Sequence, residues 1–226
     1  MPRRTKAEAL ETREQIIEAA ERVFHSKGVS RTSLNDIAHQ AGVTRGAIYW
    51  HFKNKHDVFD AMMERLRLPI EALGDRAVDP DEPDPLGKFR AFLIHILRET
   101  VHDPRRRRVL EILFHKCEFT TDTDPLMARQ REAYLDGSER MRPIFHKAIA
   151  RGQLPADLDV ERAVMRLHVL FTGIIYTWLL MPDSFDLEAE AVNFVDCYLA
   201  ALIHHCNPQI NLPAGMFTAE NKDDKN

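Results

Sequence analysis

Residues 33–52 read SLNDIAHQAGVTRGAIYWHF and predict two short helices joined by a tight turn. Ser33 and Asp36 have the spacing of a capping box, which would start the first helix, and Gly42 would end it. An alanine four positions before Gly42 and Ile48 six positions after it give the spacing of a helix-turn-helix. Many helical hairpins satisfy this spacing, so the exposed side chains of the second helix are the more specific signal.

The second helix of this pair would expose side chains that suit the major groove of DNA. Thr44 can cap it, Arg45 near its start can donate two hydrogen bonds to a guanine, and Gly46 lets the backbone approach the bases. For Trp50 the alternative is that it packs with Phe52 against the preceding helix. The candidate DNA contacts on and just after this helix are Thr44, Arg45, Gly46, Ala47, Tyr49, Trp50, His51 and Lys55.

The charge of the chain is unevenly distributed. Residues 1–56 contain ten Lys or Arg against six Asp or Glu and carry a formal charge of +4, whereas the remaining residues carry −8. A basic N-terminal segment on an acidic body favours a polyanionic partner for that segment alone. Arg105–Arg108 form a second basic run, for which a solvated face is expected rather than a nucleic-acid patch.

The rest of the pattern is also helical and predicts an all-α fold. A helix is expected over 5–27, and another begins after Asn54 and meets Pro69, where a kink or break that could serve as a hinge is expected. Residues 79–85 resemble a linker. The predicted domains are a helix-turn-helix domain (1–56), a larger helical domain (57–206) and a flexible polar tail (207–226). Further helices are expected near 86–102, 104–117, 125–151, 160–181 and 187–206.

Composition excludes several classes of protein. The chain has 226 residues, is 44% hydrophobic and contains three cysteines, which argues against disorder and against a disulfide scaffold. The longest apolar run, 167–181, is shorter than the roughly 20 residues of a membrane span, so a soluble cytoplasmic protein is expected. No phosphate-binding loop, nucleophile elbow or metal-ligand spacing is present, so we expect neither an enzyme nor a cofactor.

The helix-turn-helix run VTRGAIYWHFKNK (43–55) strongly resembles the DNA-binding domain of tetracycline-repressor-like (TetR) regulators. The preceding segments 12–28 and TSLNDIA (32–38) fit the same family. The resemblance implies two further DNA contacts, Thr32 and Ser33. The segments EILFHKCEF (111–119), LPADL (154–158), 173–180 and SFDL (184–187) are similar to the AcrR subgroup, whose members repress multidrug efflux operons. The resemblance extends to about residue 206.

The resemblance implies a dimeric repressor that hydrophobic or amphipathic compounds release from a palindromic operator. The dimer would form through the last two helices, 160–181 and 187–206. The alternative is a TetR-like regulator of a non-efflux operon that responds to one specific metabolite. A scaffold that binds DNA without sensing a ligand is a further possibility.

The resemblance also implies a ligand chamber within the C-terminal helices. Ligand binding would shift the linking helix 55–77 and so change the separation of the two DNA-binding domains. An apolar stripe can equally be plain protein core, which is the alternative for every position. The predicted chamber residues are Leu66, Phe89, Phe92, Leu93, Ile96, Leu110, Leu113, Phe114, Met141, His168, Phe171, Thr172, Ile175 and Tyr176.

Overall fold

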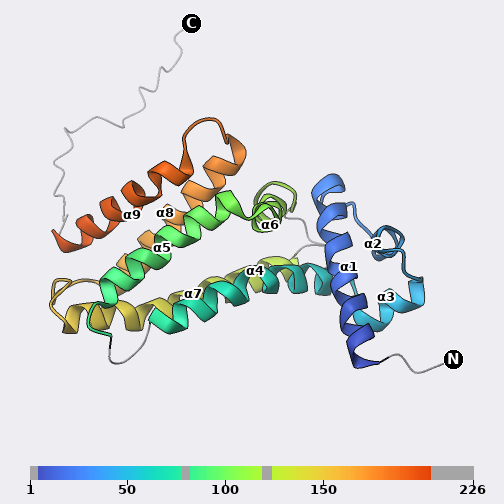
Figure 1. Cartoon of the computed structure of the whole chain (residues 1–226), viewed down its shortest axis with the longest axis horizontal. Coiled ribbons are helices and arrows are strands. Elements are labelled where there is room, and N and C mark those ends of the chain that lie inside the picture. Colours follow the sequence, from blue (N-terminus) through green and yellow to red (C-terminus); the bar gives the residue numbers. More distant parts are fainter. Residues whose placement is uncertain (1–4, 78–81, 119–123, 205–226) are drawn as a thin grey trace, which may run out of the picture.

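The computed structural model describes residues 5–77, 82–118 and 124–204, and over these residues the chain consists of helices and connecting turns without strands. The predicted all-α class is therefore confirmed. A small head lies at one end of an elongated body, and α4 runs from the head into the body beside α7 (Figure 1). The helices are α1 (Lys6–Lys27), α2 (Leu34–Ala41), α3 (Arg45–His51), α4 (Lys55–Ala77), α5 (Pro85–His102), α6 (Pro104–His115), α7 (Asp124–Ala150), α8 (Val160–Leu180) and α9 (Leu187–Ile203).

The helix starts predicted in the N-terminal segment are confirmed. Ser33 and Asp36 form both hydrogen bonds of a capping box before α2. Thr44 accepts a backbone hydrogen bond in the first turn of α3, and Asn54 accepts one from the backbone N–H of Asp57 at 2.9 Å. These bonds satisfy N–H groups that a helix start would otherwise leave without a partner.

Of the kink or break expected at Pro69, the break is wrong, because α4 continues through it to Ala77, and the kink stays a prediction. A proline removes one backbone hydrogen bond, and the remaining ladder holds this helix together. The expected linker is shorter than predicted, since Pro85 already belongs to the first turn of α5 and residues 78–81 lie outside the described residues. The predicted tail, 207–226, also lies outside them.

The head, formed by α1–α3 and the first half of α4, has its own apolar core. Ile16, Ile37 and Ile48 are fully buried in it, and the ring of Phe24 meets that of Phe59 edge-on, with 6.0 Å between the ring centres. Val109 and Ile112 of α6, together with Leu126, also belong to this core. The head therefore packs directly against α6.

The body has a second core, in which α5 packs against α9 and α7 packs against α8. Phe89 and Phe145 form an edge-on ring pair at its centre, and Tyr198 donates a hydrogen bond to the carbonyl of Ala163 at 2.7 Å. Leu66 of α4 packs against both cores. The helix that leaves the DNA-binding segment thus continues along the body.

Among the described helices, α8 alone is long and apolar enough to cross a membrane, with 39% of the tested segment buried. The expectation that this region is too short for a span used only residues 167–181, whereas the helix begins at Val160 and has 21 residues. Length therefore does not exclude a span. One side of α8 packs into the body core through Leu167, Ile175 and Trp178, as in a core helix of a globular protein.

Candidate DNA interface and ligand site

The helix-turn-helix forms as the spacing predicts. Gly42 has φ 66°, in the left-handed region where glycine is favoured, and the backbone N–H of Val43 bonds to the carbonyl of Ala38 at 3.0 Å. Ala38 is buried where α2 faces α3, and Ile48 is fully buried beneath the second helix. The opposite side of α3 is consequently held outward by the head core.

The outward side of α3 carries most of the predicted contacts. Arg45 is exposed, with its guanidinium 5.7 Å from the ring centre of Tyr49, which is itself 50% exposed. Trp50 is 72% exposed, so the alternative that it packs into the core does not hold. Phe52 does take that role: it is buried beneath the guanidinium of Arg13.

Four other predicted contact residues lie close in sequence to Arg45 and Tyr49. Thr44 caps α3 at the surface, and Gly46 is exposed with open space around the position of a Cβ atom. Ala47 and His51 are partly exposed, and the ring of His51 lies 4.5 Å from that of Trp50. The structure thus brings the predicted residues 44–51 together around one exposed helix.

The side chains of three predicted contact residues form hydrogen bonds within the protein. Thr32 is only 3% exposed and donates its hydroxyl to the carbonyl of Gly28 at 2.7 Å, so it does not present its side chain on this face. The hydroxyl of Ser33 donates to Asp36 within the capping box. Lys55 is partly buried and its ammonium donates to the carbonyl of Ser30 at 3.0 Å. The prediction is corrected most clearly at Thr32.

Most of the predicted chamber residues lie in the body core or pack against it. Leu113 instead packs against the head core. The buried ones belong to the packed core of the body, and two of the partly buried ones, Leu66 and Ile96, line a small pocket. Those in the body core are Phe89, Leu93, Leu110 and Ile175, and those packed against it are Leu66, Phe92, Phe114, Met141 and Phe171.

The predicted chamber residues of α8 that carry polar groups differ in their exposure. His168 is partly buried beside α7, 4.4 Å from the ring of Tyr134 and 3.3 Å from the hydroxyl of Ser138, and burial lowers its pKa. Thr172 is exposed, and Tyr176 is 41% exposed while packing edge-on to Phe114. Thr172 and Tyr176 are therefore open to solvent, whereas His168 is shielded on the side of α7.

A cleft of about 420 Å³ between α4 and α7 was missed by the sequence analysis. Its carboxylates come in two pairs, each separated by four residues on one helix, a spacing at which like charges repel. That repetition was visible in the sequence, but the packing of α4 on α7 was not. The cleft is lined by Phe59, Asp60, Met63, Glu64, Leu66, Arg67, Leu126, Arg129, Gln130, Glu132, Ala133 and Asp136.

The electrostatic environment of this cleft is negative near Asp60. Arg129 approaches this carboxylate to 2.8 Å, yet burial raises the pKa of Asp60 to about 6, and Glu64 and Glu132 act in the same direction. Within the described part of the chain, the buried Nε2 atom of Gln130 has no hydrogen-bond partner. The cleft therefore combines an apolar floor with unsatisfied polar groups.

The arginine run of α6 does not form the expected solvated face. Arg105 bonds to Glu21 of α1 at 3.1 Å, and Arg107 bonds to Glu111 at the same distance while lying 4.8 Å from the ring centre of Trp178. These contacts join α6 to the head on one side and to α8 on the other. The basic run therefore has a structural role at the junction.

Along α8 and α9, apolar side chains remain exposed on one side. Met165, Val169, Tyr176 and Leu180 follow the spacing of a single helical face, and Val169 is 65% exposed. Ile203 at the end of α9 is exposed as well. As for metals, the described His, Cys, Asp and Glu side chains form no group of three or more that could hold an ion.

Comparison with known proteins agrees with this architecture. Residues 16–62 match the family of bacterial regulatory proteins called the tetR family, and residues 84–204 match the C-terminal region of MAATS-type transcriptional repressors. The chain is 48% identical to the regulator TtgR of Pseudomonas putida over 202 residues, which covers 89% of this chain and 96% of that one. It is 43% identical over 195 residues to AcrR of Shigella flexneri, covering 86% and 91%.

Solved structures give the same result. NalD, a secondary repressor of the MexAB-OprM efflux pump in Pseudomonas aeruginosa, matches with a TM-score of 0.79 at 34% identity, over 88% of this chain and 98% of that one. The complex of SmeT with triclosan matches with a TM-score of 0.80 at 34% identity, covering 90% and 96%. This chain is a member of the TetR family of transcriptional regulators, with the C-terminal region of the MAATS-type repressors.

Proposed function

We propose that this protein represses a multidrug efflux operon and is released from its operator by hydrophobic or amphipathic compounds. The DNA-binding part of this proposal rests on the exposed face of α3. Arg45, Gly46 and Tyr49 lie together on that face, and Ile48 on the opposite side of the helix is buried. The efflux part is supported by NalD and SmeT, which repress multidrug efflux pumps, and by the presence of triclosan in a SmeT complex. A regulator rather than an enzyme is supported by the same relatives.

The proposed oligomer is a homodimer formed through α8 and α9. A continuous exposed apolar face such as that of Met165, Val169 and Leu180 is costly to leave in water and marks an interaction surface. A two-fold dimer would place two α3 helices on successive major-groove turns, about 34–36 Å apart or a multiple of it. The same pairing would shield α8 without a membrane, in agreement with the expected cytoplasmic location.

For the inducer we propose the cleft between α4 and α7. Its volume suits a small drug, Phe59, Met63 and Leu126 offer apolar contacts, and Gln130 offers an unused donor. Because α4 begins four residues after α3 ends, a ligand that displaces α4 also displaces the recognition helix. The ligand must prefer the displaced state by the coupling energy, typically about 1–3 kcal/mol.

The test is fluorescence anisotropy with DNA from upstream of the protein's own gene, titrated with triclosan. Ala133→Phe fills the cleft with a phenyl ring, and Ala128→Phe places the same ring on α7 outside the residues that line it. We expect triclosan to release the wild type and Ala128→Phe alike, and to act roughly tenfold more weakly on Ala133→Phe. Equal release of both variants would contradict the cleft as the inducer site.

A further inference from the structure

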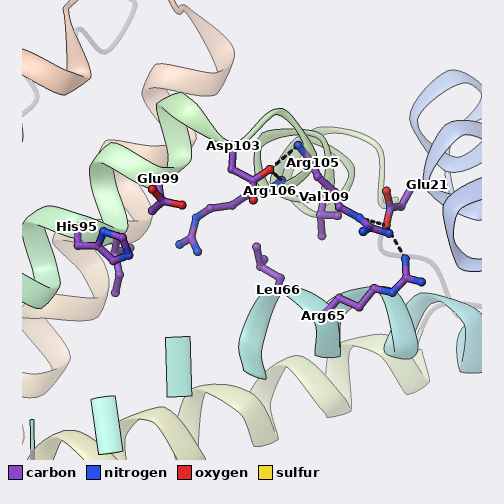
Figure 2. A pocket seen from close by; sticks show the side chains of 10 residues that line it. Glu21, Arg65, Leu66, His95, Glu99, Asp103, Arg105, Arg106 and Val109 are labelled. Atoms are coloured by element: carbon purple, nitrogen blue, oxygen red, sulfur yellow. Dashed lines mark hydrogen bonds and ion pairs between the residues drawn. The ribbon is translucent and has the colours of Figure 1, made fainter. Parts of the chain in front are cut away.

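A second pocket, of about 110 Å³, lies where α4, α5 and α6 meet α1 (Figure 2). It is separate from the cleft between α4 and α7, with Leu66 lining both. Its walls mix guanidinium groups and carboxylates with three aliphatic side chains, Leu66, Ile96 and Val109. A pocket of this composition suits a ligand that has one charged end and a short apolar end.

On the side of the head, the charges of the pocket are already matched. Glu21 is only 2% exposed, and its carboxylate accepts hydrogen bonds from Arg65 at 3.3 Å and from Arg105 at 3.1 Å. Arg65 also pairs with Glu14. On the α6 side, Asp103 accepts from the backbone N–H groups of that helix. These groups hold the walls together and leave little capacity for a ligand.

Arg106 differs from its neighbours in the arginine run. Its Nε donates to the hydroxyl of Thr100 at 3.2 Å, but no ion pair joins its terminal nitrogens to any carboxylate of the described residues. Burial lowers its pKa, although the charges of Glu99 and Asp103 act in the opposite direction. Figure 2 shows its guanidinium extending into the pocket, away from the cluster around Glu21. A partly buried guanidinium without an ion pair is a suitable binding point for an anion.

The size of the pocket restricts the ligand that Arg106 can bind. Its volume of about 110 Å³ is smaller than the roughly 150 Å³ cavity that accommodates benzene, so only a short chain of a few atoms has room inside it. The terminal nitrogens of Arg106 would bind the charged end of such a ligand, and the aliphatic side chains would contact its apolar end.

We propose that this pocket binds a short-chain monocarboxylate, with its carboxylate on the terminal nitrogens of Arg106 and its alkyl chain against Leu66, Ile96 and Val109. The proposal concerns binding alone and does not depend on the proposed operator or on the inducer cleft. Glu99 lines the same pocket and repels the incoming charge, so removing its charge should tighten binding.

The experiment is a titration of the full-length protein without DNA, using butyrate as the probe and butyramide as its neutral analogue, followed by NMR chemical shifts at constant ionic strength. We expect saturable butyrate binding with a dissociation constant on the order of 1 mM and no saturable binding of butyramide. Arg106→Gln should weaken butyrate binding at least roughly tenfold, and Glu99→Gln should strengthen it about threefold. Arg162→Gln removes an equal charge from an exposed arginine and should change nothing.

Ile96→Phe provides a second test that leaves every charge in place, because it fills the pocket from its aliphatic wall. It should abolish butyrate binding, and preserved backbone spectra would show that the fold is intact. The proposal is overturned if butyrate does not bind, if butyramide binds equally well, or if Arg106→Gln and Ile96→Phe both bind butyrate as the wild type does.

Discussion

The head and the body of this protein are both helical, yet they present their polar groups in different ways. In the head, short helices are fixed by caps and by a left-handed Gly42, and one face displays Arg45 and Tyr49 above a fully buried Ile48. In the body, long helices pack less completely and leave a cleft between α4 and α7 in which carboxylates face apolar side chains. A rigid face suits a target of constant shape, such as duplex DNA, whereas a cleft between helices suits ligands of varied shape.

The largest expected effect tests the role of the body in pairing two heads. Val169→Glu places a charge in the middle of the exposed α8 face and should convert the dimer to a monomer, as measured by analytical ultracentrifugation. Operator affinity should fall by about 10²–10⁴, because the second head no longer binds as part of the same molecule. Arg131→Glu, at an exposed position on α7 and therefore outside that face, is the charge-changing control. A Val169→Glu protein that stays dimeric would contradict the proposed interface.

A smaller effect is expected within each head. Arg45→Ala should cost about 1–3 kcal/mol of operator binding per head, since it removes a side chain placed to bond a guanine edge. Anisotropy with the operator measures the loss, and thermal unfolding should be unchanged because Arg45 is exposed. If Arg45→Ala kept wild-type affinity, the assignment of α3 as the recognition helix would have to be abandoned.

Gly46→Ala separates stability from recognition within the same helix. A Cβ atom at Gly46 meets only the hydroxyl oxygen of Thr44, at 4.0 Å, so alanine should raise the free energy of unfolding by up to about 1 kcal/mol. Operator affinity should nevertheless fall, because the added methyl group keeps the backbone from the bases. Chemical denaturation measures the expected rise in stability, and anisotropy on the same preparation measures the expected fall in operator affinity. Gly42→Ala, at φ 66°, should instead lower stability.

The smallest effect concerns the acidic side of the cleft. Because burial raises the pKa of Asp60 to about 6, the folded state holds this proton more tightly than the unfolded chain. Its contribution to stability is therefore complete below about pH 4 and is lost as the pH rises to about 6. Asp60→Asn should be more stable than the wild type by on the order of 1 kcal/mol at pH 7.5 and equal to it at pH 4. If Asp60→Asn remained more stable than the wild type at pH 4, the raised pKa of Asp60 would not be the cause of its stability.

The head was largely predictable from sequence because its signals are local. Capping residues such as Ser33 and Thr44 and the turn glycine Gly42 act within a few residues of themselves, and each formed as expected. Thr32 was the exception, because its burial depends on a hydrogen bond to Gly28 that composition does not reveal. The sequence does not predict whether the side chain of Trp50 is buried or exposed, because an aromatic residue near Phe52 can lie in a core or on a surface. The structure shows that it is exposed.

The body was less predictable because a cleft depends on how distant helices pack. Phe89 and Leu93 carry a pattern that fits a chamber wall or a core equally well, and they lie in the core. The paired carboxylates Asp60 and Glu64 are evident in the sequence, but nothing there places them opposite Glu132. The arginine run also looked like a solvated face because its partner Glu21 lies more than 80 residues away in the chain.

The most direct test of the account compares DNA binding and triclosan binding in three proteins: the wild type, Arg45→Ala and Ala133→Phe. We predict that the wild type binds its upstream DNA with an affinity that falls steeply with salt and is released by triclosan. Arg45→Ala should weaken DNA binding by about 1–3 kcal/mol per head and keep its affinity for triclosan, whereas Ala133→Phe should keep its affinity for DNA and bind triclosan roughly tenfold more weakly. If either substitution weakened both activities in a folded protein, or neither activity, the division between a DNA-reading head and a ligand-sensing body would be contradicted.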